Sequence, residues 1–338
     1  PLFDFTLHAG PGQYRGFFWF YFFNEHLLRF LNLRYPRDYN TVPRVQFWLY
    51  HLLWVFPWTA YLAGVARLRF HDANRASRTR LLCLSTIAFV LFFFTLSTTQ
   101  EYYTMPAYPA FAILVACAMV RREPQSIAAW NRIARIATGA IFSLALAAIV
   151  YLLARVWSIP TQGDIAGALS SNPEAYTLAL GHLEDLTVES FAYLKLPLAV
   201  AGVAMLAGAA GAFLFRGYRS VLVIAAAMVM FFSAARLALT VFDPYLSTRS
   251  LAVAYDAAPP GELVFDDQFY AFSSVAFYAD ERVLLLNGRI NNLEYGSYEP
   301  GAPNVFIDNA EFAARWHSAQ RYYIVVAAPR VPAIEEIV

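Results

Sequence analysis

Long apolar runs separated by short charged loops make up most of the first 241 residues of the chain. A transmembrane α-helix needs roughly 20 predominantly apolar residues, and about six segments approach that length. These segments are 46–66, 81–98, 104–120, 136–154, 196–215 and 221–241. The pattern predicts an α-helical polytopic membrane protein with about six transmembrane helices.

The pattern changes in the C-terminal part, where shorter apolar runs alternate with helical patterns. Strands are predicted at 262–267, 282–286, 304–308 and 321–327, and helices at 268–279 and 309–318. Alternation of strands and helices is typical of an α/β domain with a largely parallel sheet. We expect Asp308 or Asn309 to cap the second of these helices.

These patterns divide the chain into three parts. Residues 1–45 are predicted to form an interfacial loop with one amphipathic helix. Residues 46–241 form the transmembrane core, with an outer loop at 155–195 that holds a short helix near 173–180. Residues 242–338 form the small α/β domain.

Arginine residues gather in every second loop between the predicted spans. They are Arg67, Arg69, Arg75, Arg78 and Arg80, then Arg121, Arg122, Arg132 and Arg135, then Arg216 and Arg219. The turn at 99–103 has no basic residue, and loop 155–195 has only Arg155 and Lys195, at its edges. By the positive-inside rule the Arg-rich loops are cytoplasmic, so residues 1–45 and the α/β domain are expected to be extracytoplasmic.

Composition supports a membrane protein and restricts its partners. The chain is 59% hydrophobic and 14% charged, with a mean hydropathy of +0.44, whereas soluble domains are about one quarter charged. The net charge of +1 gives no sign of a nucleic-acid partner, and we expect none. Cys83 and Cys117 lie in apolar segments, which predicts free thiols. Because the chain begins with Pro1, we expect that an N-terminal part is missing.

Residues 14–45 combine many aromatic side chains with a cluster of charges. Four Arg residues between positions 29 and 44 exclude the hydrocarbon core, and aromatic rings favour headgroup depth. Arg29, Arg34, Arg37 and Arg44 each present a planar fork that suits phosphate. The alternative for each is contact with an ordinary anionic lipid headgroup.

Glu25, His26 and Arg29 stand close together in the sequence FNEHLLRF. A carboxylate and an imidazole are ligands for a divalent metal ion, so Glu25 and His26 form a candidate metal site. The alternative is a surface ion pair of Glu25 with Arg29, which share a helix face, beside a solvated His26. The pair lacks the HExxH spacing of zinc sites.

A second candidate segment is the turn at 98–109, TTQEYYTMPAYP. The hydroxyl groups of Tyr102 and Tyr103 would bond a phosphate or a sugar there. The alternative is an aromatic belt with prolines at the start of a helix. The chain has no GxSxG motif, no phosphate-binding P-loop and no CxxC pair, which argues against cytoplasmic nucleotide chemistry.

The segments YFFNEHLLRF (21–30), FPW (56–58) and QEYYTMPAYPAFAIL (100–114) resemble the membrane glycosyltransferases of the GT-C superfamily. The nearest similarity is to the bacterial branch of aminoarabinose transferases and relatives of protein O-mannosyltransferases. It covers roughly residues 12–120, and the rest fits in architecture alone.

The resemblance implies an enzyme of the bacterial cytoplasmic membrane. It would transfer a sugar from a polyprenyl-phosphate donor to an acceptor such as lipid A, a glycan or a protein. By position, Arg29 and Tyr103 would contact the lipid phosphate, and we add Arg37 to this group. His26, with Glu25, would approach a divalent metal ion.

Two features depart from the family pattern. Relatives of the aminoarabinose type carry a Lys four residues before the tyrosine that matches Tyr103, and here that position is Thr99. In the family, the catalytic carboxylate lies in the first outer loop, on N-terminal spans that we expect to precede the present sequence. The resemblance therefore leaves the sugar and the general base open.

The competing interpretation is a non-enzymatic membrane protein, either a lipid transporter or a lipid-binding scaffold. Transporters carry charged or broken helices at mid-membrane. Here the polar residues gather on one face of the membrane instead, which favours catalysis at the interface over transport.

Overall fold

The computed structural model describes residues 18–35, 41–97, 99–120, 125–163, 165, 188–267, 269–290, 292–298 and 301–338. Five helical segments in this described part are long and apolar enough to cross a membrane: 75–96, 102–119, 129–156, 190–213 and 218–244. The predicted helix near 173–180 lies outside the described residues. The chain is a multi-pass helical membrane protein, as its sequence predicts.

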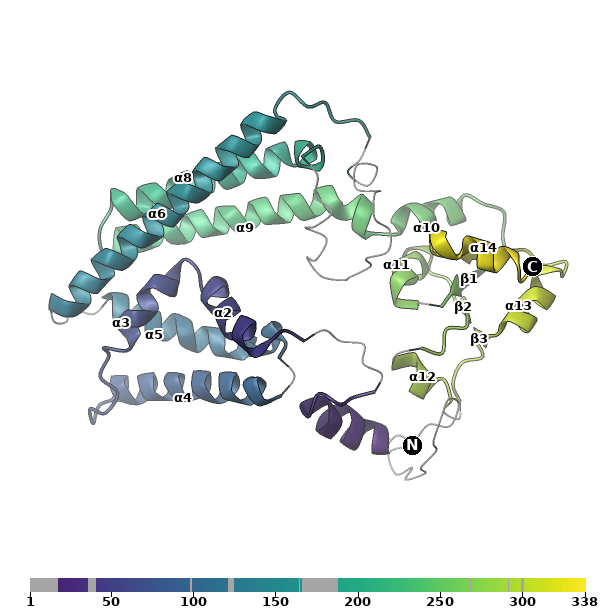
Figure 1. Ribbon diagram of the computed structural model, residues 1–338, viewed down its shortest axis with the longest axis horizontal. Coiled ribbons are helices and arrows are strands. Elements are labelled where there is room, and N and C mark those ends of the chain that lie inside the picture. The colour runs from purple at the N-terminus through teal and green to yellow at the C-terminus, as the bar shows by residue number, and fades with distance from the viewer. Residues whose placement is uncertain are drawn as a thin grey trace.

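The α-helices of these segments are labelled in Figure 1. They are α4 (Arg75–Leu96), η3 (Glu101–Ala107) with α5 (Tyr108–Val120), α6 (Gln125–Val156), η5 (Ser190–Leu194) with α8 (Lys195–Phe213), and α9 (Tyr218–Leu246). A 22-residue helix such as α4 is about 33 Å long at 1.5 Å per residue. That length matches the hydrocarbon core of a bilayer.

The predicted span at 46–66, the first along the chain, is not one continuous helix. The structure divides it into α2 (Arg44–Trp54), a 3₁₀ turn η2 (Trp58–Tyr61) and the short α3 (Leu62–Val65). Pro57 accounts for the break, because proline has no N–H and its ring clashes with the preceding helical turn. The prediction of a single helix here was wrong, since apolar length alone does not reveal a broken helix.

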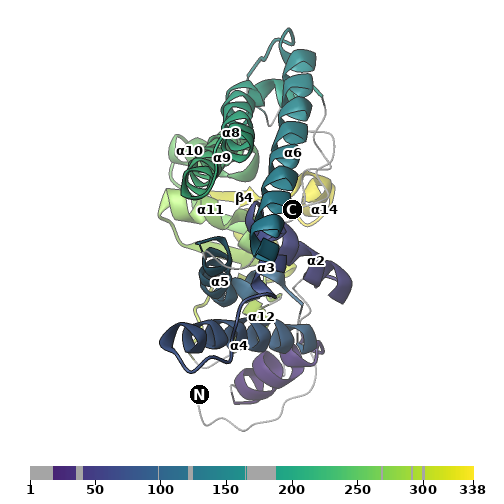
Figure 2. The same ribbon diagram turned by 90° about the vertical axis from the view of Figure 1, so that its left-hand side faces the viewer.

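Helices α6, α8 and α9 form one group in Figure 1, and Figure 2 shows α8 and α9 side by side with α6 next to them. Small residues allow the close approach. A Cβ atom added at Gly208 would lie 2.9 Å from the ring of Phe142, which is fully buried. One at Gly211 would lie 2.9 Å from Val223. Small residues at such positions are typical of membrane helix interfaces.

A second group contains α3, α4 and α5, with its own apolar core around Leu91, Ala107 and Leu114. The N-terminal helix η1 (Trp19–Leu28) lies beyond one end of α4, between that end and the C-terminal domain (Figure 1). The side chains Tyr21, Phe22, Phe23 and Leu27 of η1 are all more than 40% exposed. An exposed aromatic surface at the end of the membrane helices suits the membrane–water interface.

The C-terminal part is a small α/β domain, which confirms the predicted fold class. Its elements are α10 (Arg249–Asp256), β1 (Glu262–Asp266), α11 (Phe269–Ala279), β2 (Val283–Leu286), α12 (Asn292–Gly296), β3 (Phe306–Ile307), α13 (Asn309–Trp316), β4 (Tyr322–Val325), η6 (Ala328–Arg330) and α14 (Val331–Glu335). The sheet order is β3-β2-β1-β4, and all pairs are parallel. Asp308 caps α13 by accepting a 2.8 Å hydrogen bond from the backbone N–H of Glu311.

Both faces of this sheet are covered. Successive side chains of a strand point to opposite faces, so Leu263 and Phe265 pack with Val275 of α11, whereas Val264 packs with Phe312 of α13. At the carboxyl end of β1, Asp266 is buried and accepts two hydrogen bonds from Arg330, at 2.7 and 2.9 Å. This bidentate pair joins β1 to the segment that follows β4.

Candidate phosphate site

The candidate site begins with a fold-back of the chain after η1, which has π-helical i→i+5 geometry. Asn24 is fully buried, and its amide makes two hydrogen bonds with the backbone of Tyr35. Its Nδ2 donates to the Tyr35 carbonyl at 2.5 Å, and its Oδ1 accepts from the Tyr35 N–H at 3.0 Å. Asn32 takes the left-handed conformation that the reversal needs, with φ 59°. Residues 29–35 are thereby held against the helix.

Glu25 then lies between two guanidinium groups. Its Oε2 accepts from Nη1 of Arg29 at 3.2 Å, and its Oε1 accepts from Nε of Arg34 at 2.6 Å. The Arg34 side chain is 2% exposed, whereas that of Arg29 is 32% exposed. One carboxylate between two guanidiniums leaves the trio with one positive charge, and Arg29 is the accessible member.

Arg29 also meets Tyr103, which lies 74 residues further along the chain. Nη2 of Arg29 donates to the Tyr103 hydroxyl at 2.5 Å, and its Cζ lies 5.9 Å from the centre of the ring. The ring of Tyr103 packs in turn on Phe94, with centroids 5.2 Å apart. The structure thus brings together two of the three residues predicted to contact a lipid phosphate. The third, Arg37, lies outside the described residues.

The two predicted metal ligands have separate partners. The Glu25 carboxylate is bound by two guanidiniums, whereas Nδ1 of the exposed His26 lies 2.6 Å from the carbonyl oxygen of Tyr21. Because a carbonyl only accepts, Nδ1 carries the proton, and Nε2 of a neutral His26 keeps its lone pair. In the part of the chain that the structure describes, no three His, Cys, Asp or Glu residues gather as a metal site. The metal ion stays a prediction, and no chemical step here depends on it.

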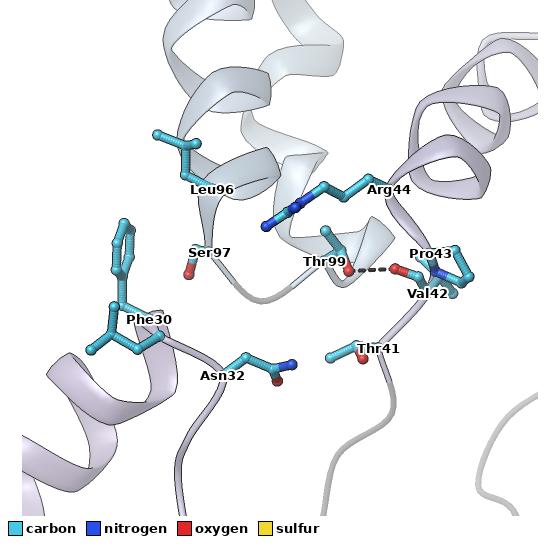
Figure 3. Close-up of a pocket in the computed structure, with 10 residues that line it drawn as sticks. Phe30, Asn32, Thr41, Val42, Pro43, Arg44, Leu96, Ser97 and Thr99 are labelled. Atoms are coloured by element: carbon cyan, nitrogen blue, oxygen red, sulfur yellow. Dashed lines mark hydrogen bonds between the residues drawn. The ribbon is translucent and has the colours of Figure 1, made fainter.

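A cavity of about 350 Å³ is lined in part by Phe30, which follows Arg29 directly in the chain, and the sequence did not single it out. It is lined by Phe30, Leu31, Asn32, Thr41, Val42, Pro43, Arg44, Leu96, Ser97 and Thr99 (Figure 3). Thr99 donates to the Val42 carbonyl at 2.5 Å, and the Val42 N–H donates to the Thr99 carbonyl at 3.1 Å. These two bonds join the segment before α2 to the segment between α4 and η3. Two sequence features could have indicated this cavity: Asn32 follows the end of a helix, and Arg44 begins one.

Comparison with known proteins gives a relation at the level of the fold. No protein-family model matches the chain, and no curated protein sequence matches it. Among solved structures it is similar to ArnT from Cupriavidus metallidurans, crystallised bound to undecaprenyl phosphate. The TM-score is 0.65 at 18% sequence identity, over 94% of this chain and 52% of ArnT.

The chain shares the fold of the part of ArnT that it matches. The chain spans about half the length of ArnT.

Proposed function

We propose that this chain is the donor-phosphate half of a membrane glycosyltransferase. The enzyme would transfer a sugar from a polyprenyl-phosphate donor to a lipid, glycan or protein acceptor outside the bacterial cytoplasmic membrane. The observation that carries this proposal is the contact between Arg29 and Tyr103, supported by the fold shared with an undecaprenyl-phosphate-bound protein.

The proposed chemistry is displacement at the anomeric carbon of the donor sugar, with polyprenyl phosphate as the leaving group. Negative charge grows on the phosphate as the glycosidic bond breaks. Arg29 would stabilise that charge, and the Tyr103 hydroxyl would donate a further hydrogen bond. Arg37 is proposed to join them.

Glu25 and Arg34 are assigned positioning roles. Glu25 accepts from both guanidiniums, so it fixes the direction of the Arg29 fork. Because both carboxylate oxygens are engaged in this way, Glu25 is a poor general base. We propose that the base which takes the acceptor proton lies outside this chain's sequence, in the full-length protein.

The proposal that the site faces the extracytoplasmic side rests on the distribution of arginine residues along the chain. The connections of α3 with α4 and of α8 with α9, and the start of α6, lie at the left of Figure 1, away from η1. The positive-inside rule would make that end cytoplasmic. Donor and acceptor lipids would then both lie in the outer leaflet beside the site, which favours their encounter. The α/β domain is proposed to face the same side.

The test is sugar transfer in membrane vesicles, with the gene extended to its natural start. We expect Arg29→Ala to lower the transfer rate by about 100-fold, the effect of losing one charge-stabilising donor. Arg315→Ala is the matched control, because Arg315 pairs with Glu311 at the same i,i+4 spacing and with similar exposure of its side chain, 33%.

Three outcomes are informative. Transfer that falls with Arg29→Ala and persists with Arg315→Ala supports the proposal. Equal losses in both variants, or no transfer from any polyprenyl-phosphate donor by a correctly inserted protein, would contradict it. The last result would favour a lipid-binding scaffold or a transporter.

A further inference from the structure

The cavity lined by Phe30, Asn32 and Arg44 contains polar groups that make no hydrogen bond to other described residues. The Oδ1 atom of Asn32 is buried and has no hydrogen-bond partner within the described residues. A buried acceptor without a partner costs free energy, so rotation of the Asn32 amide that brings Oδ1 to a ligand N–H or O–H would be favoured. Thr41 and Ser97 add two hydroxyl groups to the same lining. In Figure 3 the nitrogen of the Asn32 amide points across the opening toward Thr41, and its oxygen points away from Thr41.

Arg44 gives the cavity its charge. None of the ten lining residues is acidic, and Arg44 is their one cation. Its Nε donates to the carbonyl of Thr95 at 3.2 Å, which anchors the guanidinium at the end of α4. Figure 3 shows the group extending between Leu96 and Thr99. Arg44 is exposed, so its terminal nitrogens are accessible to a ligand.

We infer that this cavity binds a hydroxyl-bearing group that carries a carboxylate or a phosphate. The Arg44 fork matches such an anion with two parallel hydrogen bonds. Asn32, Thr41 and Ser97 match its hydroxyl groups. The inference rests on the proposed function, which puts the donor phosphate at Arg29 and hence the donor sugar, or the acceptor group that attacks it, next to the cavity.

The same charge works against an amino sugar. An ammonium group in the cavity would face the Arg44 guanidinium with no carboxylate among the ten described lining residues to compensate it, and like charges at short range repel. Thr99, which also lines the cavity, donates its hydroxyl hydrogen bond to the carbonyl of Val42 and adds no charge. The cavity therefore selects an acidic group over a neutral one, and a neutral group over an amino group.

A binding experiment separates this inference from the proposed function. Full-length protein in lipid nanodiscs is titrated with undecaprenyl phosphate and with three undecaprenyl-phosphate sugars that differ only at carbon 6: glucuronate, glucose and 6-aminoglucose. We expect glucuronate to bind on the order of tenfold or more tighter than glucose, the effect of one charge-assisted contact, and 6-aminoglucose to bind weakest.

Two variants locate the effect. Arg44→Gln is expected to remove the order among the three sugars and to leave the affinity for bare undecaprenyl phosphate unchanged. Asn32→Ala is expected to weaken all three sugars and to spare bare undecaprenyl phosphate. Arg29→Ala is expected to weaken all four ligands equally and to preserve the order.

Each outcome decides one question. An Arg44-dependent preference among the donors makes the donor sugar the acidic group. Equal donor affinities with Arg44-dependent binding of a soluble glucuronate-terminated disaccharide assign the cavity to the acceptor. Equal affinities in both series, or a preference that is lost when the phosphatidylglycerol content of the nanodisc is raised, would overturn the inference. Failure of bare undecaprenyl phosphate to bind would overturn the proposed function instead.

Discussion

The two guanidinium groups that Glu25 binds differ strongly in solvent exposure, and this difference decides which of them a ligand can reach. Arg34 is 2% exposed and fixes the carboxylate from the inside, while Arg29 is 32% exposed and faces outward toward Tyr103. An arginine restrained in this way loses less conformational entropy when it binds a phosphate. The described residues thus hold the Arg29 guanidinium in a fixed position beside the Tyr103 hydroxyl.

The side chain of Asn24 is the residue on which this arrangement depends. Asn24→Ala would leave the backbone N–H and carbonyl of Tyr35 without their side-chain partner. We expect a loss of about 1–3 kcal/mol in the free energy of unfolding, together with weaker binding of undecaprenyl phosphate. Thermal unfolding and lipid titration of the same variant measure both effects, and an unchanged unfolding temperature would contradict this role for Asn24.

Sequence reasoning recovered the local part of the site and missed the part made by tertiary contacts. The i,i+4 spacing gave the pair of Glu25 with Arg29 as the alternative to a metal site, and the family resemblance added Tyr103. Neither signal revealed that Arg34 shares the same carboxylate, nor that Asn32 and Arg44 line one cavity, because both depend on how the chain folds back between residues 29 and 44.

At the scale of elements, helix packing depends on single small residues. A Cβ atom at Gly208 of α8 would lie 2.9 Å from the buried ring of Phe142, whereas one at Gly202 of the same helix would lie 3.4 Å from Ile149, an ordinary contact. We therefore expect Gly208→Ala to destabilise the protein by about 1–3 kcal/mol. Gly202→Ala serves as the control and is expected to be neutral. Unfolding followed by tryptophan fluorescence compares the two, and equal effects would refute the packing argument.

Elements with strong local signals were the predictable ones. The four strands and the two main helices of the α/β domain lie within a few residues of their predicted ranges, because each combines an apolar run with a turn or a cap. The π-helical geometry of η1 and the break at Pro57 were not predicted. Both change the hydrogen-bonding pattern inside a segment whose apolar composition stays the same.

At the scale of the whole molecule, Tyr35 connects the candidate site to the α/β domain. The negative charge of Glu294 on α12, followed by burial and a hydrogen bond to Glu294, raises the pKa of Tyr35 above its ordinary value of 10.0. A raised pKa in the folded state means that this contact contributes its full stability below pH 10 and loses it as the pH rises through the folded-state pKa.

Tyr35→Phe removes the titrating group and tests this connection. We expect the unfolding temperature of the variant to lie below that of the wild type at pH 8. The difference should shrink as the pH rises above 10, because the wild type then loses the same contact. Thermal unfolding between pH 8 and 11 checks this, and a difference that stays constant across the range would contradict it.

The central claim is that Arg29 and Tyr103 bind the phosphate of a polyprenyl lipid. The most direct measurement is the affinity of the nanodisc-embedded protein for undecaprenyl phosphate and for undecaprenol, which lacks the phosphate. We predict that the phosphate improves the affinity of the wild type on the order of tenfold or more, and that this advantage disappears in Arg29→Ala but persists in Arg315→Ala. Equal affinity for the two lipids in the wild type, or a phosphate advantage that survives Arg29→Ala, would contradict the claim.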